Sequence, residues 1–187
     1  MKKKSLLLIA IFLLGFAIPQ IAFADDNKGE QTITVSLGEV ALLAIPPNIV
    51  ELTLSGATVA GAPAAVALTD EDSRLRITSV VGTGTRSILA ELTTGKAPVG
   101  TILQIEASHS LQNFIGVEGT SSGVQPITNS TTGAVTVITG IGTCNSGTAD
   151  GDGYVLKYTF GLDADPATTA AAGSVDITIT YTLSAAS

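Results

Sequence analysis

Few side chains in this sequence have the chemistry needed for catalysis. The chain contains one histidine, His109, and one cysteine, Cys144. His109 is flanked by two serines, and we identify no nucleophile elbow that would complete a Ser-His-Asp triad with it. No basic residue flanks Cys144 to stabilise a reactive thiolate. We therefore expect no catalytic residues and a protein that is not an enzyme.

Acidic residues offer the strongest alternative chemistry. In the segment Asp150-Gly-Asp152-Gly-Tyr154, oxygen ligands alternate with glycine, as in the first half of a calcium loop. Tyr154 stands where a third ligand is needed, and Asp-Gly also favours a tight hairpin turn. We keep Asp150 and Asp152 as candidate calcium ligands, with a plain turn as the other interpretation. Otherwise we expect no cofactor.

Hydrophobic alternation dominates the rest of the chain and predicts strands. From 174 to 183, apolar residues alternate with Asp and Thr, as on a half-buried antiparallel strand. Similar patterns predict strands over 32–37, 40–45, 49–54, 73–81, 86–93, 101–107, 113–117, 134–140 and 154–160. About ten short strands separated by Gly and Pro turns indicate an all-β fold, an antiparallel β-sandwich of jelly-roll or Ig-like type. The polar stretch 116–133 reads as a long surface loop.

One of these strands is a candidate for assembly. Residues 31–37 alternate polar and apolar side chains, with Ile33, Val35 and Leu37 on one face. Such a strand either pairs within its own sheet or completes the sheet of a neighbouring subunit through main-chain hydrogen bonds. The terminal strand 174–183 raises the same question.

The N-terminus predicts export. Three lysines precede an apolar run, and small residues lie at Ala22 and Ala24, which is the pattern of a signal peptide spanning 1–24. A flexible leader, 25–31, and a single domain, 32–187, would follow. Six basic residues then remain against 16 acidic ones, a net charge of −10. This acidity argues against nucleic acid partners. We expect a bacterial protein that is secreted, periplasmic or at the cell surface, with no membrane span after cleavage.

Several segments resemble those of uncharacterised secreted bacterial β-proteins. The similarity rests on 39–45, 137–142, 151–159 and 177–183. More loosely, the Thr-rich strands are similar to those of pilin-like and spore-coat-like sandwiches. The resemblance implies a surface location and assembly with other protein subunits. We therefore expect a structural or adhesive role, acting through strand pairing and loop contacts. The alternative is an extracellular module that binds a glycan or Ca²⁺.

Overall fold

The strands of this protein form one antiparallel sheet in a computed structural model of the chain. The structure describes residues 31–46, 50–54, 59–60, 67–109, 113–127, 133–163 and 172–187. The chain divides into two units, Met1–Ser36 and Leu37–Ser187, and the sheet belongs to the second. The predicted signal peptide 1–24 and nearly all of the predicted leader lie outside the described residues.

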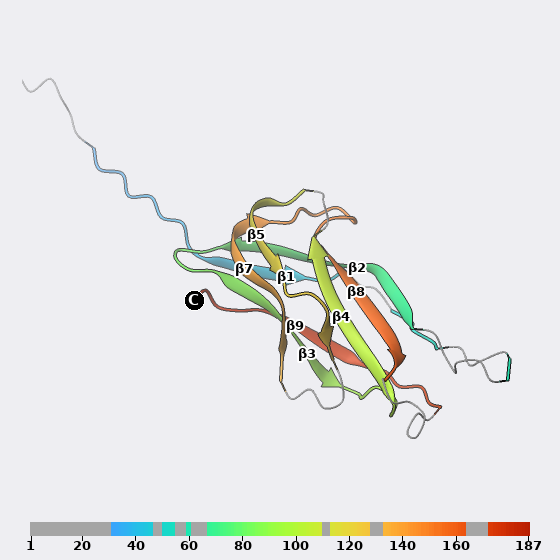
Figure 1. Cartoon of the computed structure of the whole chain (residues 1–187). Coiled ribbons are helices and arrows are strands. Elements are labelled where there is room, and N and C mark those ends of the chain that lie inside the picture. Colours follow the sequence, from blue (N-terminus) through green and yellow to red (C-terminus); the bar gives the residue numbers. More distant parts are fainter. Residues whose placement is uncertain are drawn as a thin grey trace, which may run out of the picture. The chain divides into compact units, whose positions relative to one another are not determined.

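The described residues contribute nine strands to the sheet, most of which are labelled in Figure 1. They are β1 (Val40–Ala44), β2 (Leu68–Val80), β3 (Arg86–Thr94), β4 (Thr101–His109), β5 (Ile115–Ser121), β6 (Gln125–Pro126), β7 (Val135–Asn145), β8 (Tyr154–Leu162) and β9 (Thr178–Leu183). Their order is β6-β4-β8-β2-β7-β3-β9, with β1 paired to β2 and β5 paired to β7. We find no helix among the described residues, which confirms the all-β prediction.

Two strands change partners along their length. The first half of β2 pairs with β8, and its second half pairs with β1 and, near its end, with β7. In β7, the first part pairs with β3 and the last two residues pair with β2. The register shifts where Ile138 and Ile141 oppose Ile88 and Arg86, and Gly140 between them has a φ of 73°. A bulge at a left-handed glycine bends a strand, so β7 can follow both partners.

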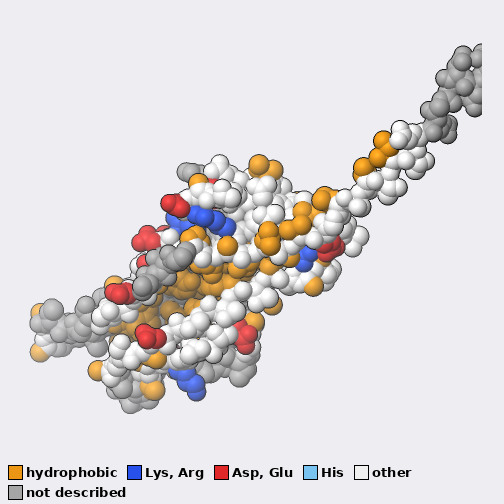
Figure 2. All heavy atoms as spheres, turned by 180° about the vertical axis from the view of Figure 1, so that it is seen from behind, with side chains coloured by type: hydrophobic (Ala, Val, Ile, Leu, Met, Phe, Trp, Pro, Cys, Tyr) orange, Lys and Arg blue, Asp and Glu red, His pale blue; other side chains and the backbone are white. Residues whose placement is uncertain are grey.

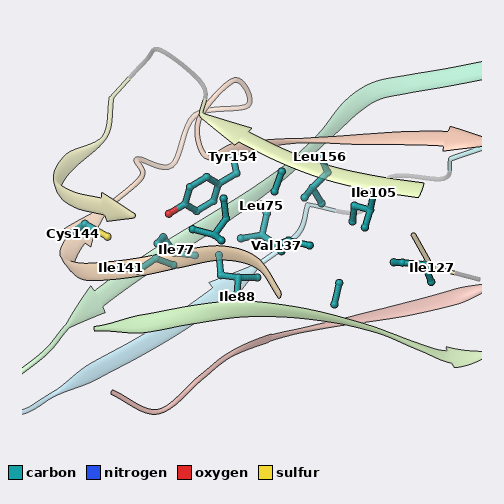
Figure 3. Close-up of a cluster of buried hydrophobic side chains, with 13 residues drawn as sticks. Leu75, Ile77, Ile88, Ile105, Ile127, Val137, Ile141, Cys144, Tyr154 and Leu156 are labelled. Atoms are coloured by element: carbon teal, nitrogen blue, oxygen red, sulfur yellow. The ribbon is translucent and has the colours of Figure 1, made fainter. Parts of the chain in front are cut away.

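A single apolar core joins strands that are not neighbours in the sheet. Its residues are Leu75, Ile77, Ile88, Ala90, Ile105, Ala107, Ile127, Val137, Ile138, Ile141, Cys144, Tyr154 and Leu156. In β2, β3 and β4 they alternate with less buried residues, as the period-2 pattern predicts, whereas the bulged strand β7 buries the adjacent residues Val137 and Ile138. Figure 3 shows these side chains converging from several strands. The buried face of the sheet therefore provides the packing that holds the domain together.

Some element predictions need correction. The predicted loop 116–133 contains most of β5, whose Gly, Ser and Thr residues gave no strand signal, and all of β6, which is only the pair Gln125-Pro126. Residues 32–37 and 50–54 belong to no strand. The last strand is shorter than predicted, because 174–177 stay outside the ladder with β3.

Candidate functional site

The N-terminal segment before β1 has exposed apolar side chains and pairs with no strand among the described residues. Residues 31–39 belong to no strand of the sheet. Ile33, Val35 and Leu37 are 72%, 87% and 82% exposed, respectively. Figure 2 shows apolar side chains along this segment. An alternating segment of this kind can add to a sheet edge, where its backbone donors and acceptors pair with those of the edge strand.

The last strand offers such an edge. β9 ends the order of the sheet and pairs only with β3 among the described residues. The N–H of Ser184 donates to the carbonyl of Ser87 at 2.8 Å. Hydrogen-bonded and non-hydrogen-bonded pairs alternate along an antiparallel ladder, so the peptide groups of Ile179, Tyr181 and Leu183 face away from β3. Their side chains are only half-buried. Within the described part of the chain, the β9 edge therefore has unpaired backbone groups beside an incompletely covered apolar row.

Arg86 connects both ends of the domain. Its Nη2 lies 3.0 Å from Oε2 of Glu39, just before β1, and its Nη1 donates to the carbonyl of Ser184 at 3.0 Å. Oε1 of Glu39 also accepts a hydrogen bond from the N–H of Gly82. The Arg86 side chain is 6% exposed. The sequence analysis did not single out Arg86. The signal for it was that Arg86 lies two and four residues before Ile88 and Ala90, on the face of β3 that is buried.

The candidate calcium ligands lie in the β7–β8 loop but have different surroundings. Asp152 is buried, and its carboxylate accepts hydrogen bonds from Nδ2 of Asn113 at 2.6 Å and from the N–H of Ala149 at 2.7 Å. These two hydrogen bonds lower the pKa of Asp152. Asp150 is exposed and lies 3.3 Å from Nη2 of Arg76. The described residues contain no group of three or more His, Cys, Asp or Glu able to hold a metal ion.

His109 lies at the end of β4 in a mixed polar and aromatic cluster. Its Nδ1 is 3.1 Å from Oε1 of Glu118, although it makes no hydrogen bond within the described part of the chain. The rings of Phe114 and Tyr154 pack against its imidazole. The hydroxyl of Tyr154 donates to the backbone carbonyl of Glu118, and burial raises the pKa of Tyr154. Burial, together with the nearby Glu118, also raises the pKa of the Cys144 thiol.

Sequence analysis overlooked one match to the Gly-x-Ser-x-Gly spacing, in 119–123. A nucleophile elbow places its serine between a strand and a helix. Here Ser121 ends β5, an irregular segment leads to β6, and the Oγ of Ser121 accepts a hydrogen bond from the N–H of Gly123. The motif therefore lacks the strand–turn–helix context that exposes a nucleophile.

Comparisons with protein families, with curated proteins and with solved structures found no match to this chain. Among the described residues, no helix has the length and apolar character needed to cross a bilayer.

Proposed function

We propose that this chain is an exported, non-enzymatic structural subunit that associates with other copies by strand pairing. The observation that carries the proposal is the exposure of Ile33, Val35 and Leu37 on an alternating segment outside the sheet. Exposed apolar strands promote association with other chains, and domains usually cover or charge them. This segment has no charged residue between 31 and 38. Its composition therefore favours addition to a sheet edge.

We also propose that the sheet folds over itself into a β-sandwich. The hydroxyl oxygens of Tyr158 in β8 and Tyr181 in β9 are 2.8 Å apart. Strands β2, β7 and β3 separate β8 from β9 in the sheet order. Neighbouring strands lie about 4.8 Å apart, so a flat sheet would separate β8 and β9 by roughly 19 Å. Folding at β2 and β7, the strands that change partners, would bring β8 and β9 face to face.

The surroundings of His109 favour a structural role over hydrolysis. Its described contacts are one acid, Glu118, and the rings of Phe114 and Tyr154. A general base must lie within hydrogen-bond reach of a reacting group that substrate can approach. Tyr154 is fully buried and its hydroxyl already donates to a backbone carbonyl. The cluster therefore suits packing between β4, β5 and β8.

A glycan-binding module has less support. Sugar sites usually need exposed aromatic rings, and the aromatic residues of β8 are the best candidates in the sequence. Tyr154 is buried, while Tyr158 and Phe160 are half-buried. The structural proposal thus accounts for more of the exposed apolar surface than the alternative does.

Size measurement and electron microscopy of the mature chain test the proposal. Residues 25–187 should form oligomers or filaments, and removal of 25–38 should leave monomers with an unchanged melting temperature. A matched control, Ile33→Lys with Val35→Lys, should also give monomers, because charges on the apolar face oppose burial. A full-length mature chain that stays monomeric at high concentration would contradict the proposal.

A further inference from the structure

The exposed N-terminal segment closely repeats the sequence of β9. Residues 32–37 read Thr-Ile-Thr-Val-Ser-Leu, and residues 178–183 read Thr-Ile-Thr-Tyr-Thr-Leu. Thr, Ile, Thr and Leu are shared at corresponding positions, and Ser replaces Thr at a fifth. Each segment therefore has three apolar side chains on one face and three hydroxyl side chains on the other. Neither has a charge that would repel the other.

We propose that residues 32–37 of one copy add as a new antiparallel strand to the β9 edge of a second copy. This inference rests on the proposed function and names its acceptor. The peptide groups of Ile179, Tyr181 and Leu183 point to the open edge of β9, and their side chains are half-buried. A strand with matching alternation would satisfy those groups and extend the apolar row.

The matching patterns select one register. With Val35 opposite Tyr181, Ile33 faces Leu183 and Leu37 faces Ile179, so every apolar side chain has an apolar neighbour. A shift of two residues in either direction leaves one apolar residue of each strand unmatched. On the other face, Thr34 then lies opposite Thr182 and Ser36 lies opposite Thr180. Aromatic–β-branched and Thr–Thr cross-strand pairs stabilise sheets.

Replacement of β9 is less favourable than addition beside it. β9 makes contacts that 32–37 cannot repeat, namely the hydrogen bond between Tyr181 and Tyr158 and that between Ser184 and Arg86. A strand attached to its own domain also competes at a high effective concentration. The added strand should therefore leave β9 in place.

The chain's own segment cannot adopt this antiparallel register. Arg86 binds both Glu39 and the carbonyl of Ser184, which fixes the start of β1 near the end of β9. A segment folding back along its own β9 from Glu39 would place Leu37 near Leu183 and run parallel to the strand. The antiparallel arrangement therefore requires a second copy.

Disulfide cross-linking between two single variants tests the register. Both carry Cys144→Ala to remove the native thiol, one has Thr34→Cys, and the other has Thr182→Cys. Opposed residues in a non-hydrogen-bonded pair have Cα atoms about 4.5 Å apart, within disulfide range. Mixing the two proteins under mild oxidation should give a 34–182 heterodimer at least about tenfold faster than Thr34→Cys mixed with Thr178→Cys, four residues away. Matched melting temperatures of the variants would show that each is folded.

Proline substitution provides a second test in the donor segment, which belongs to no strand among the described residues. In the proposed register the N–H of Val35 donates a hydrogen bond to a backbone carbonyl of β9, whereas the N–H of Thr34 points away from β9. Val35→Pro should therefore reduce association far more than Thr34→Pro.

The two tests separate the inference from the proposed function. Suppose that oligomers still require residues 25–38, but Thr34→Cys cross-links to Thr120→Cys in β5 and not to Thr182→Cys. That result would overturn β9 as the acceptor and leave strand-mediated assembly standing. Equal loss of association in both proline variants would also overturn the register. Monomers throughout would refute both proposals.

Discussion

The hydroxyl groups of Tyr158 in β8 and Tyr181 in β9 share a hydrogen bond of 2.8 Å. Three strands separate β8 and β9 along the sheet order. This contact ties the last strand of the chain to a strand from the opposite part of the sheet.

Removing one of these hydroxyls should weaken the domain. We expect Tyr181→Phe to lower the free energy of unfolding by about 1 kcal/mol, the net contribution of a typical hydrogen bond. Chemical denaturation measures the change. The double variant with Tyr158→Phe should cost less than the sum of the single variants, because it leaves no unpaired hydroxyl. Additive effects would contradict the contact.

The same pair predicts a loss of stability at alkaline pH. Burial raises the pKa of Tyr158 and the pKa of Tyr181 above their ordinary value. The unfolded chain therefore loses its phenolic protons first, near the reference tyrosine pKa of about 10. In a Cys144→Ala background, stability should be constant up to about that pH and fall as pH rises further. The double Phe variant should show a shallower decline in denaturation measured between pH 8 and pH 11.

Asp152 predicts the opposite dependence at acid pH. Its hydrogen bonds with Asn113 and the N–H of Ala149 lower its folded-state pKa below the unfolded value of about 3.9. Its contribution is therefore complete above that value and is lost as pH falls through the lower, folded-state pKa. Asp152→Asn should lower the melting temperature at pH 7 and flatten this acid dependence. Asp150→Asn, an equal charge change on an exposed side chain, is the control and should have little effect.

Calcium should not stabilise the β7–β8 loop. The carboxylate of Asp152 already accepts two hydrogen bonds, and Arg76 lies beside Asp150. A bound cation would have to displace the hydrogen bonds to Asp152, and the positive charge of Arg76 would repel it. We expect melting temperatures in millimolar Ca²⁺ to equal those in chelator. A calcium-dependent rise that Asp152→Asn abolishes would instead establish the calcium loop that the sequence suggested.

Arg86 should matter more to stability than its partner Glu39. Arg86→Met removes the hydrogen bond to Ser184 and the ion pair with Glu39, and hydrogen bonds to charged groups contribute about 1.5–3 kcal/mol each. Glu39 is 53% exposed, so Glu39→Gln should cost less, since water screens the pair and the amide oxygen can still accept from Gly82. Denaturation of both variants gives the comparison, and equal losses would contradict it.

Alternation in the sequence located most strands but not their pairing. The pattern around Leu75 and Ile77 predicted β2 from 73, whereas the strand begins at Leu68 because its acidic start pairs with β8. β5 escaped prediction beyond residue 117 because Gly116 and Gly119 interrupt the apolar period. The exposed segment 31–37 was recognised as a strand candidate, but only three-dimensional pairing distinguishes an incorporated strand from a free one.

In the candidate site, too, single residues could be predicted from the sequence but their partners could not. Asp152 was selected for its carboxylate. The sequence could not reveal that Asn113, 39 residues away, donates a hydrogen bond to that carboxylate. The environment of His109 likewise depends on Glu118 and Tyr154, which three different strands bring together. Local patterns predict elements, whereas partners distant in sequence depend on the sheet topology.

The bond network at Glu39 also affects how the protein would respond to force. In a filament linked through residues 32–37, tension would enter each domain at Leu37 and reach Glu39 two residues later. Arg86 and Gly82 hold that carboxylate, so the load would be shared among the β2–β3 loop, β3 and the end of β9 before β1 could peel from the sheet. The buried guanidinium of Arg86 would thus add to the mechanical resistance of every link, beside the ladder between β1 and β2.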